Sequence, residues 1–121
     1  MTSHAETKYL PYTAKEMFDL VADISSYPEF LPWCAAARVR KEIQKGVIKQ
    51  IEADLVISFK VFREKFGSRV ILDASKFTIE TEYLDGPFRH MQSVWSFNNS
   101  EQGCEVNFNV DFEFKNAMLQ S

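Results

Sequence analysis

Apolar and polar residues alternate strictly over two long segments of the chain. In Gln50–Lys60 the odd positions are apolar and nearly all even positions are polar, and in Cys104–Lys115 the even positions are the apolar ones. A period of two places all the apolar side chains of a strand on one face. Each segment therefore predicts a β-strand with one buried and one solvated face.

Five further strands are predicted, with the same alternation in Lys76–Tyr83 and weaker patterns in Ala37–Ile43 and Phe88–Phe97. They cover Ser3–Tyr9, Ala37–Ile43, Phe66–Leu72, Lys76–Tyr83 and Phe88–Phe97. Short polar connections such as Asp85–Pro87 and Asn98–Gly103 join consecutive strands. Such turns favour antiparallel hairpins over crossovers, so neighbours in the sequence are expected to be neighbours in the sheet.

A helical period occurs only between the first predicted strand and the others. Thr13 and Glu16 form a capping box that begins a helix, and Met17–Ala22 supplies its apolar stripe. A second helical turn over Ser26–Phe30 ends at Leu31–Pro32, because the residue before a proline is disfavoured in the α conformation. The predicted fold class is α+β, with one strand, two short helices and then roughly six strands in a meander.

Length and charge restrict the class of protein. At 121 residues the chain has the usual size of one domain, so we expect a single domain over residues 1–121. The net charge of −3 and the absence of a basic stripe argue against DNA or RNA as a charge-driven ligand. No apolar stretch approaches the ~18 residues of a membrane span, and the first ten residues do not resemble a signal peptide. We expect a cytoplasmic protein, peripheral to the inner membrane at most.

The predicted sheet has more apolar surface than two short helices can cover. The chain contains 11 phenylalanines, many of them at the alternating strand positions. After Lys115 only Asn116–Ser121 remain, and Ala117, Met118 and Leu119 look like the opening of a helix. We therefore expect the natural protein to continue into a long amphipathic helix that lies across the sheet.

Residues suited to catalysis or metal binding are few and scattered. Cys34 and Cys104 are too far apart for a zinc knuckle and are interpreted as small buried hydrophobes. His90 has no GxSxG-type nucleophile motif beside it. Glu64 and Asp111 would make an acid–base pair only if both faced a pocket, and alternation puts Asp111 on the solvated face. We predict no catalytic residue, no metal site and no catalytic cofactor.

Three motifs resemble those of a known family. Tyr27–Cys34, which reads YPEFLPWC, resembles the signature of the coenzyme Q-binding family of START-like domains. Asp85–His90 and Val110–Lys115 resemble later motifs of that family in the same order. The family also covers polyketide cyclase/dehydrase-type and ribosome-association-toxin-like members. The resemblance implies a helix-grip fold, in which a curved antiparallel sheet wraps round a long C-terminal helix and encloses a hydrophobic tunnel.

The alternation and the resemblance together predict an apolar groove for a ligand. Its predicted lining consists of Leu31, Trp33, Leu55, Ile57, Phe59, Phe77, Ile79, Met91, Trp95, Phe97, Phe108, Val110 and Phe112. Because apolar alternation mostly marks packing, the alternative interpretation of these residues is plain core. Arg89 and Met91 are two residues apart in the same predicted strand, so alternation puts both on one face and makes Arg89 a candidate polar anchor for a head group. An arginine at a strand start is more often solvated, however.

The resemblance implies a function in lipid binding. The expected ligand is ubiquinone or a similar polyisoprenoid lipid, bound as cargo by a non-enzymatic carrier or chaperone that supports respiration and quinone biosynthesis. Transient contact with the membrane or with respiratory complexes follows from that role. One alternative is a ribosome-association-toxin-like protein that interacts with ribosomal subunits. Another is a polyketide cyclase/dehydrase-like enzyme, which needs a pocket-facing acid or base that the alternation does not supply.

Overall fold

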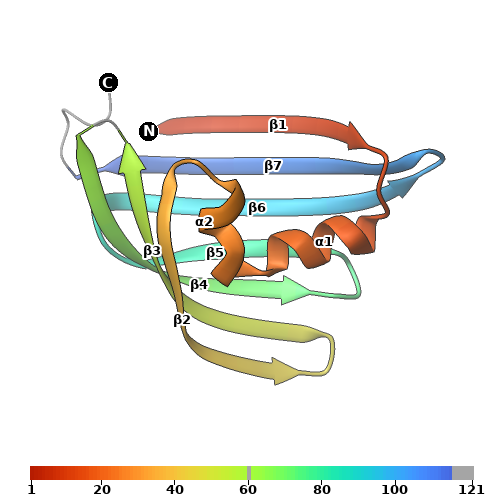
Figure 1. Ribbon diagram of the computed structural model, residues 1–121, viewed down its shortest axis with the longest axis horizontal. Helices are drawn as coiled ribbons and strands as arrows, with labels where there is room; N and C mark the ends of the chain where they lie inside the picture. Colours follow the sequence, from red (N-terminus) through yellow and green to blue (C-terminus); the bar gives the residue numbers. More distant parts are fainter. Residues whose placement is uncertain (60, 116–121) are drawn as a thin grey trace.

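Seven antiparallel strands form one curved sheet, and the helices pack on one of its faces (Figure 1). The computed structural model describes residues 1–59 and 61–115, and of Phe59 and Phe62 it describes the backbone alone. Along the chain the elements are β1 (Thr2–Leu10), α1 (Ala14–Ala22), a 3₁₀ turn η1 (Ile24–Ser26), α2 (Tyr27–Phe30), β2 (Cys34–Lys45), β3 (Ile48–Phe59), β4 (Phe62–Asp73), β5 (Thr78–Asp85), β6 (Phe88–Ser100) and β7 (Gly103–Phe114). The predicted α+β meander is confirmed.

The first strand lies beside the last one, so the spatial order is β1-β7-β6-β5-β4-β3-β2. The β1–β7 pairing runs from Thr2 opposite Phe112 to Leu10 opposite Cys104. Gly103 permits this close approach, since its φ is +150° and a Cβ there would overlap the carbonyl oxygen of Leu10. Hairpin chemistry along the sequence does not predict this long-range pair.

Helix α1 begins at the predicted capping box. The Thr13 hydroxyl accepts a hydrogen bond from the Glu16 backbone N–H at 3.1 Å, and the Glu16 carboxylate accepts one from the Thr13 N–H at 2.9 Å. The helix buries Ala14, Phe18 and Val21 and contacts β5, β6 and β7. Helix α1 therefore covers only one end of this face of the sheet (Figure 1).

The segment η1–α2 covers a different part of the same face, next to β2. Helix α2 ends at Phe30, just before Leu31–Pro32, as predicted. The buried Tyr27 hydroxyl donates a hydrogen bond to the Val21 carbonyl at 2.6 Å, which ties α2 to the end of α1. Burial raises the pKa of Tyr27, so this donor stays protonated.

Phe77 departs from the predicted strand Lys76–Tyr83. Strand β5 begins only at Thr78, and Phe77 has a φ of +52°, outside the strand conformation. The Asp73 carboxylate holds the preceding turn by accepting hydrogen bonds from the backbone N–H groups of Ser75 and Lys76. The turn chemistry therefore extends further than the apolar alternation suggested.

The core lies between the helices and the sheet. It includes Phe18, Ile24, Ala53, Ile79 and Phe97, each at most 6% exposed. In the described part of the chain, no helix is long and apolar enough to cross a bilayer. The expected continuation through Asn116–Ser121 into a long helix lies outside the described residues.

Candidate functional site

One face of the sheet, termed the inner face, carries the apolar residues of every alternating strand. Helix α1 defines this face, because the ring of Phe18 lies 5.6 Å from Phe77 and 6.3 Å from Phe97. Phe97 shares its face with Trp95, and Trp95 is paired with Ile79 on β5 and Phe108 on β7. The register therefore continues the apolar surface from strand to strand.

Part of the predicted lining is plain core. Leu55, Ile79, Met91 and Phe97 are buried, with exposed fractions of 6%, 0%, 8% and 1%. Phe77 packs on Phe18 beneath α1. The four buried side chains are already covered by protein and are not available as a ligand surface, whereas Phe77 is half-buried.

Another part of the inner face is covered incompletely. The half-buried side chains on β6 and β7, termed the open patch, are Trp95, Phe108, Val110, Phe112 and Phe114. The Trp95 and Phe108 rings lie 4.4 Å apart between centroids, and Phe112 and Phe114 lie 5.6 Å apart. These tilted ring contacts organise the patch while leaving its outer surface exposed.

Buried Phe88 supports the end of the open patch that lies furthest from α1. It is 7% exposed and stacks on Phe114 at 4.8 Å, with Phe112 at 6.0 Å. Phe66 and Tyr83 pack edge-on against the same ring at 5.7 and 5.5 Å. Sequence reasoning missed Phe88 and Phe114 as site residues, although Phe114 continues the even-numbered alternation of the last strand.

The remaining predicted lining residues lie near the α2–β2 loop. Ile57 and Leu31 are half-buried against the core, and Trp33 is 43% exposed. The Trp33 carbonyl accepts a hydrogen bond from the Ser58 N–H at 2.8 Å, which fixes the loop to β3. The side chain of Phe59 lies outside the described residues, so its predicted role stays a prediction.

A β-bulge corrects the orientation expected for Arg89. Between Phe88 and His90 the pairing of β6 with β7 shifts register, so the alternation that linked Arg89 with Met91 is interrupted. The Arg89 side chain is 68% exposed, and its Nε lies 3.8 Å from the Glu113 carboxylate. The predicted inward orientation is therefore wrong, because Arg89 is solvated beside an acidic neighbour.

Strand β1 borders the open patch with polar side chains. His4, Glu6 and Lys8 are paired in register with the inner-face residues Val110, Phe108 and Val106, so they share that face. Glu6 lies 3.7 Å from the His4 Nε2 and 3.5 Å from the Lys8 Nζ. All three side chains are about half exposed or more. The open patch thus has a charged, hydrated rim on one side. The polar residues at alternating positions of β1 could have predicted this rim from the sequence.

A hollow of about 410 Å³ lies where the pairing of β5 with β6 ends. The ladder stops after Glu82 opposite Gln92, and beyond it the Phe88 N–H donates to the Tyr83 hydroxyl at 3.0 Å. Burial raises the pKa of Tyr83 above its usual 10.0, so the hydroxyl keeps its own proton. The lining is Glu82, Tyr83, Arg89, His90, Met91 and Gln92.

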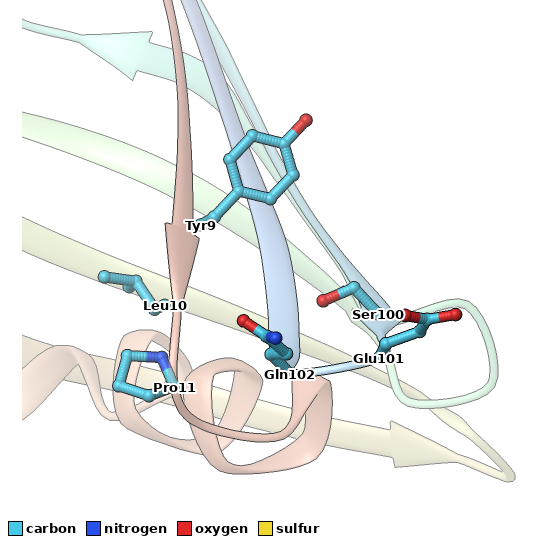
Figure 2. Close-up of a pocket in the computed structure, with 6 residues that line it drawn as sticks. All are labelled: Tyr9, Leu10, Pro11, Ser100, Glu101 and Gln102. Atoms are coloured by element: carbon cyan, nitrogen blue, oxygen red, sulfur yellow. The ribbon is translucent and has the colours of Figure 1, made fainter.

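A second hollow of about 530 Å³ lies at the far end of β1, beside the β6–β7 turn (Figure 2). It is lined by Tyr9, Leu10, Pro11, Ser100, Glu101 and Gln102. Both hollows are open to solvent and contain polar side chains, so neither has the character of the enclosed apolar tunnel that the resemblance implies.

The buried thiols are poorly suited to nucleophilic or metal chemistry. Burial raises the pKa of Cys34 and of Cys104 above 9.0, which reduces the thiolate fraction at neutral pH. Within residues 1–59 and 61–115, no three His, Cys, Asp or Glu side chains are grouped so that they could hold a metal ion. Asp111 accepts a hydrogen bond from the Ser3 hydroxyl at 2.5 Å, in an exposed position.

Comparisons with known proteins agree on one family and fold. Residues 10–121 match the family described as polyketide cyclase/dehydrase and lipid transport. Ribosome association toxin RatA of Rickettsia prowazekii is 43% identical, over 98% of this chain and 81% of that protein. The mitochondrial coenzyme Q-binding protein COQ10 homolog B of Xenopus laevis is 31% identical, over 95% of this chain and 47% of that protein. The structure of a START superfamily protein from Mycobacterium smegmatis superposes with a TM-score of 0.81 at 16% identity, over 98% of this chain and 83% of that one. The START-like fold class predicted from the motifs is confirmed.

Proposed function

This chain belongs to the polyketide cyclase/dehydrase and lipid transport family, and from that premise we propose that it binds a polyisoprenoid lipid such as ubiquinone on the open patch. It does so as a non-enzymatic carrier or chaperone, acting between the cytoplasm and the inner membrane. The family description and a relative named as a coenzyme Q-binding protein support a hydrophobic ligand. The structure supports a location for it.

The single observation that carries the proposal is that the described residues, 1–59 and 61–115, cover the open patch incompletely. Trp95, Phe108 and Phe112 remain half-buried, whereas Leu55, Ile79 and Phe97 on the same face are buried. Burying each CH₂ of an isoprenoid tail is worth about 0.8 kcal/mol and needs no directional partner. A long apolar tail therefore matches a broad surface of tilted rings better than a small polar substrate does.

An enzymatic function finds less support in the geometry. A cyclase or dehydrase needs an acid or base held in a water-excluded site. Of the titratable groups described next to the open patch, His4 and Glu6 lie on the rim, with the His4 Nε2 3.7 Å from the Glu6 carboxylate and side chains 59% and 48% exposed. These groups are hydrated rather than enclosed.

A second candidate function is association with ribosomal subunits. It is favoured by one specific observation, the 43% identity to a protein named ribosome association toxin RatA. With a net charge of −3, such a contact would not rest on neutralising RNA phosphates. Contacts to ribosomal proteins or to exposed bases would have to provide the affinity.

Organic extraction of the purified protein followed by mass spectrometry separates the two functions. We expect a quinone or another polyisoprenoid in the extract of the unaltered protein. Phe108→Asp, which places a carboxylate in the open patch, should empty the extract. Asn109→Asp is the matched control, because it introduces the same side chain one residue away on the exposed opposite face of β7. An empty extract from the unaltered protein, together with co-sedimentation with ribosomal subunits, would replace this proposal by the second one.

A further inference from the structure

Three exposed apolar side chains lie on two connections, the α2–β2 loop with the end of α2 before it and the β3–β4 turn, which together are termed the apolar end. Val61 is 94% exposed, Trp33 is 43% exposed and Phe30 is 39% exposed. The hydrogen bond from the Ser58 N–H to the Trp33 carbonyl holds the loop beside the end of β3. In Figure 1 the beginning of β2 and the end of β3 lie next to one another. The apolar end is thus built from two sequence-distant connections.

The sequence from the β3–β4 turn into the start of β4 is locally basic although the chain is acidic. Residues 60–65 contain three cations and one anion, whereas the whole chain has a net charge of −3. Arg63 and Lys65 are exposed, two and four residues beyond Val61. An apolar tip with basic flanks is the pattern of a surface that inserts shallowly into anionic lipid.

We propose that the apolar end docks on the surface of an anionic phospholipid membrane. Val61 and Trp33 enter the interfacial layer, and Arg63 and Lys65 lie against the lipid head groups. Tryptophan suits this position because its ring is apolar and its indole N–H needs a hydrogen-bond acceptor. The inference rests on the proposed function, since a carrier of a bilayer-resident lipid must collect it from the membrane.

Charge and topology favour a membrane over RNA as the partner. Recognition of RNA phosphates requires a basic stripe, and one turn with a net excess of two cations does not make one. The membrane contact needs only a small tip. The β2–β3 turn provides a natural comparison, because Val47 there is 52% exposed next to Lys45 but has no tryptophan beside it.

Flotation with phospholipid vesicles tests the inference. Vesicles of phosphatidylcholine mixed with phosphatidylglycerol should bind the protein, and vesicles of phosphatidylcholine alone should bind it several-fold less. Added salt should weaken the contact, because surface charges are screened. Each cation near an anionic surface raises the partition roughly fivefold, so Arg63→Gln should lower it by about that factor. Val61→Asp should lower it further while leaving the circular dichroism spectrum unchanged, since this side chain packs on little else.

Tryptophan fluorescence gives an independent measurement. In a Trp95→Phe variant the emission comes from Trp33, and it should shift to shorter wavelength when anionic vesicles are added. Val47→Asp is the control for a general effect of charge on an exposed turn. Equal loss of binding in Val47→Asp and Val61→Asp would overturn the inference.

The outcomes also separate this inference from the proposed function. A polyisoprenoid in the extract without vesicle binding refutes the docking surface and leaves lipid binding standing. Vesicle binding through Val61 with an empty extract supports the docking surface and refutes the cargo. Capture by ribosomal subunits that Val61→Asp abolishes, without vesicle binding, would identify the apolar end as a ribosome contact instead.

Discussion

Replacing two phenylalanines on the same face of the sheet distinguishes core from ligand surface. Phe97 is 1% exposed and contacts the rings of Phe18 and Trp95, with centroids 6.3 and 6.1 Å away. Phe97→Ala leaves a cavity beneath α1 and should lower the free energy of unfolding by about 3–5 kcal/mol. Phe108 is half-buried, and its ring lies tilted against Trp95 with the centroids 4.4 Å apart. Because part of its side chain remains in contact with water, Phe108→Ala should cost less than Phe97→Ala, about 2 kcal/mol.

The two substitutions should affect ligand affinity in the reverse order, so that Phe108→Ala weakens binding more than Phe97→Ala does. A bound tail would cover the part of Phe108 that is still exposed, which is worth about 1 kcal/mol, so Phe108→Ala should weaken binding roughly fivefold. Urea unfolding followed by circular dichroism measures the first effect, and quenching of tryptophan fluorescence by a water-soluble quinone analogue measures the second. If Phe108→Ala destabilises the protein as much as Phe97→Ala and leaves quinone affinity unchanged, the open patch is core and the reasoning is refuted.

Four further changes test local features, each followed by urea unfolding. Thr13→Ala removes the helix cap and should cost about 1 kcal/mol. The backbone N–H of Thr13, and then its hydroxyl, hold the pKa of Glu16 below its usual 4.5. This stabilisation is complete above about pH 4.5 and is lost as the pH falls below it, so Glu16→Gln should flatten that acid dependence. Gly103→Ala should cost more than about 1 kcal/mol, because the positive φ disfavours alanine and the new methyl group overlaps Leu10. Tyr83→Phe leaves a backbone N–H of β6 without its acceptor and should cost about 1–3 kcal/mol; a cost near zero would mean that water replaces the hydroxyl.

Local patterns in the sequence were sufficient for the elements and their faces. The capping box at Thr13 placed the start of α1 correctly, and strict alternation assigned the inner face of β3 and β7. Both signals act within a few residues, so no knowledge of distant contacts is needed. The turn before Phe77 shows the limit, since hydrogen bonds to Asp73 displaced the beginning of β5.

Orientation failed where the backbone adds a residue. Alternation holds only while a strand remains regular, and the bulge between Phe88 and His90 reversed the expected side of Arg89. A bulge of this kind is specified by the pairing with β7, which is remote in sequence. Nothing in the residues from Phe88 to Met91 considered alone reports it.

The sequence by itself determined that one face of the sheet is apolar, and the tertiary structure decided which parts of that face are closed. Phe97 and Phe108 lie on neighbouring strands with the same alternation, yet only Phe97 is fully buried. Burial depends on what packs above a residue, and that is set by where α1 and α2 lie across β2, β5, β6 and β7. The closure of β1 on β7 and the hydrogen bond between Trp33 and Ser58 of β3 are likewise products of chain folding over long sequence separations.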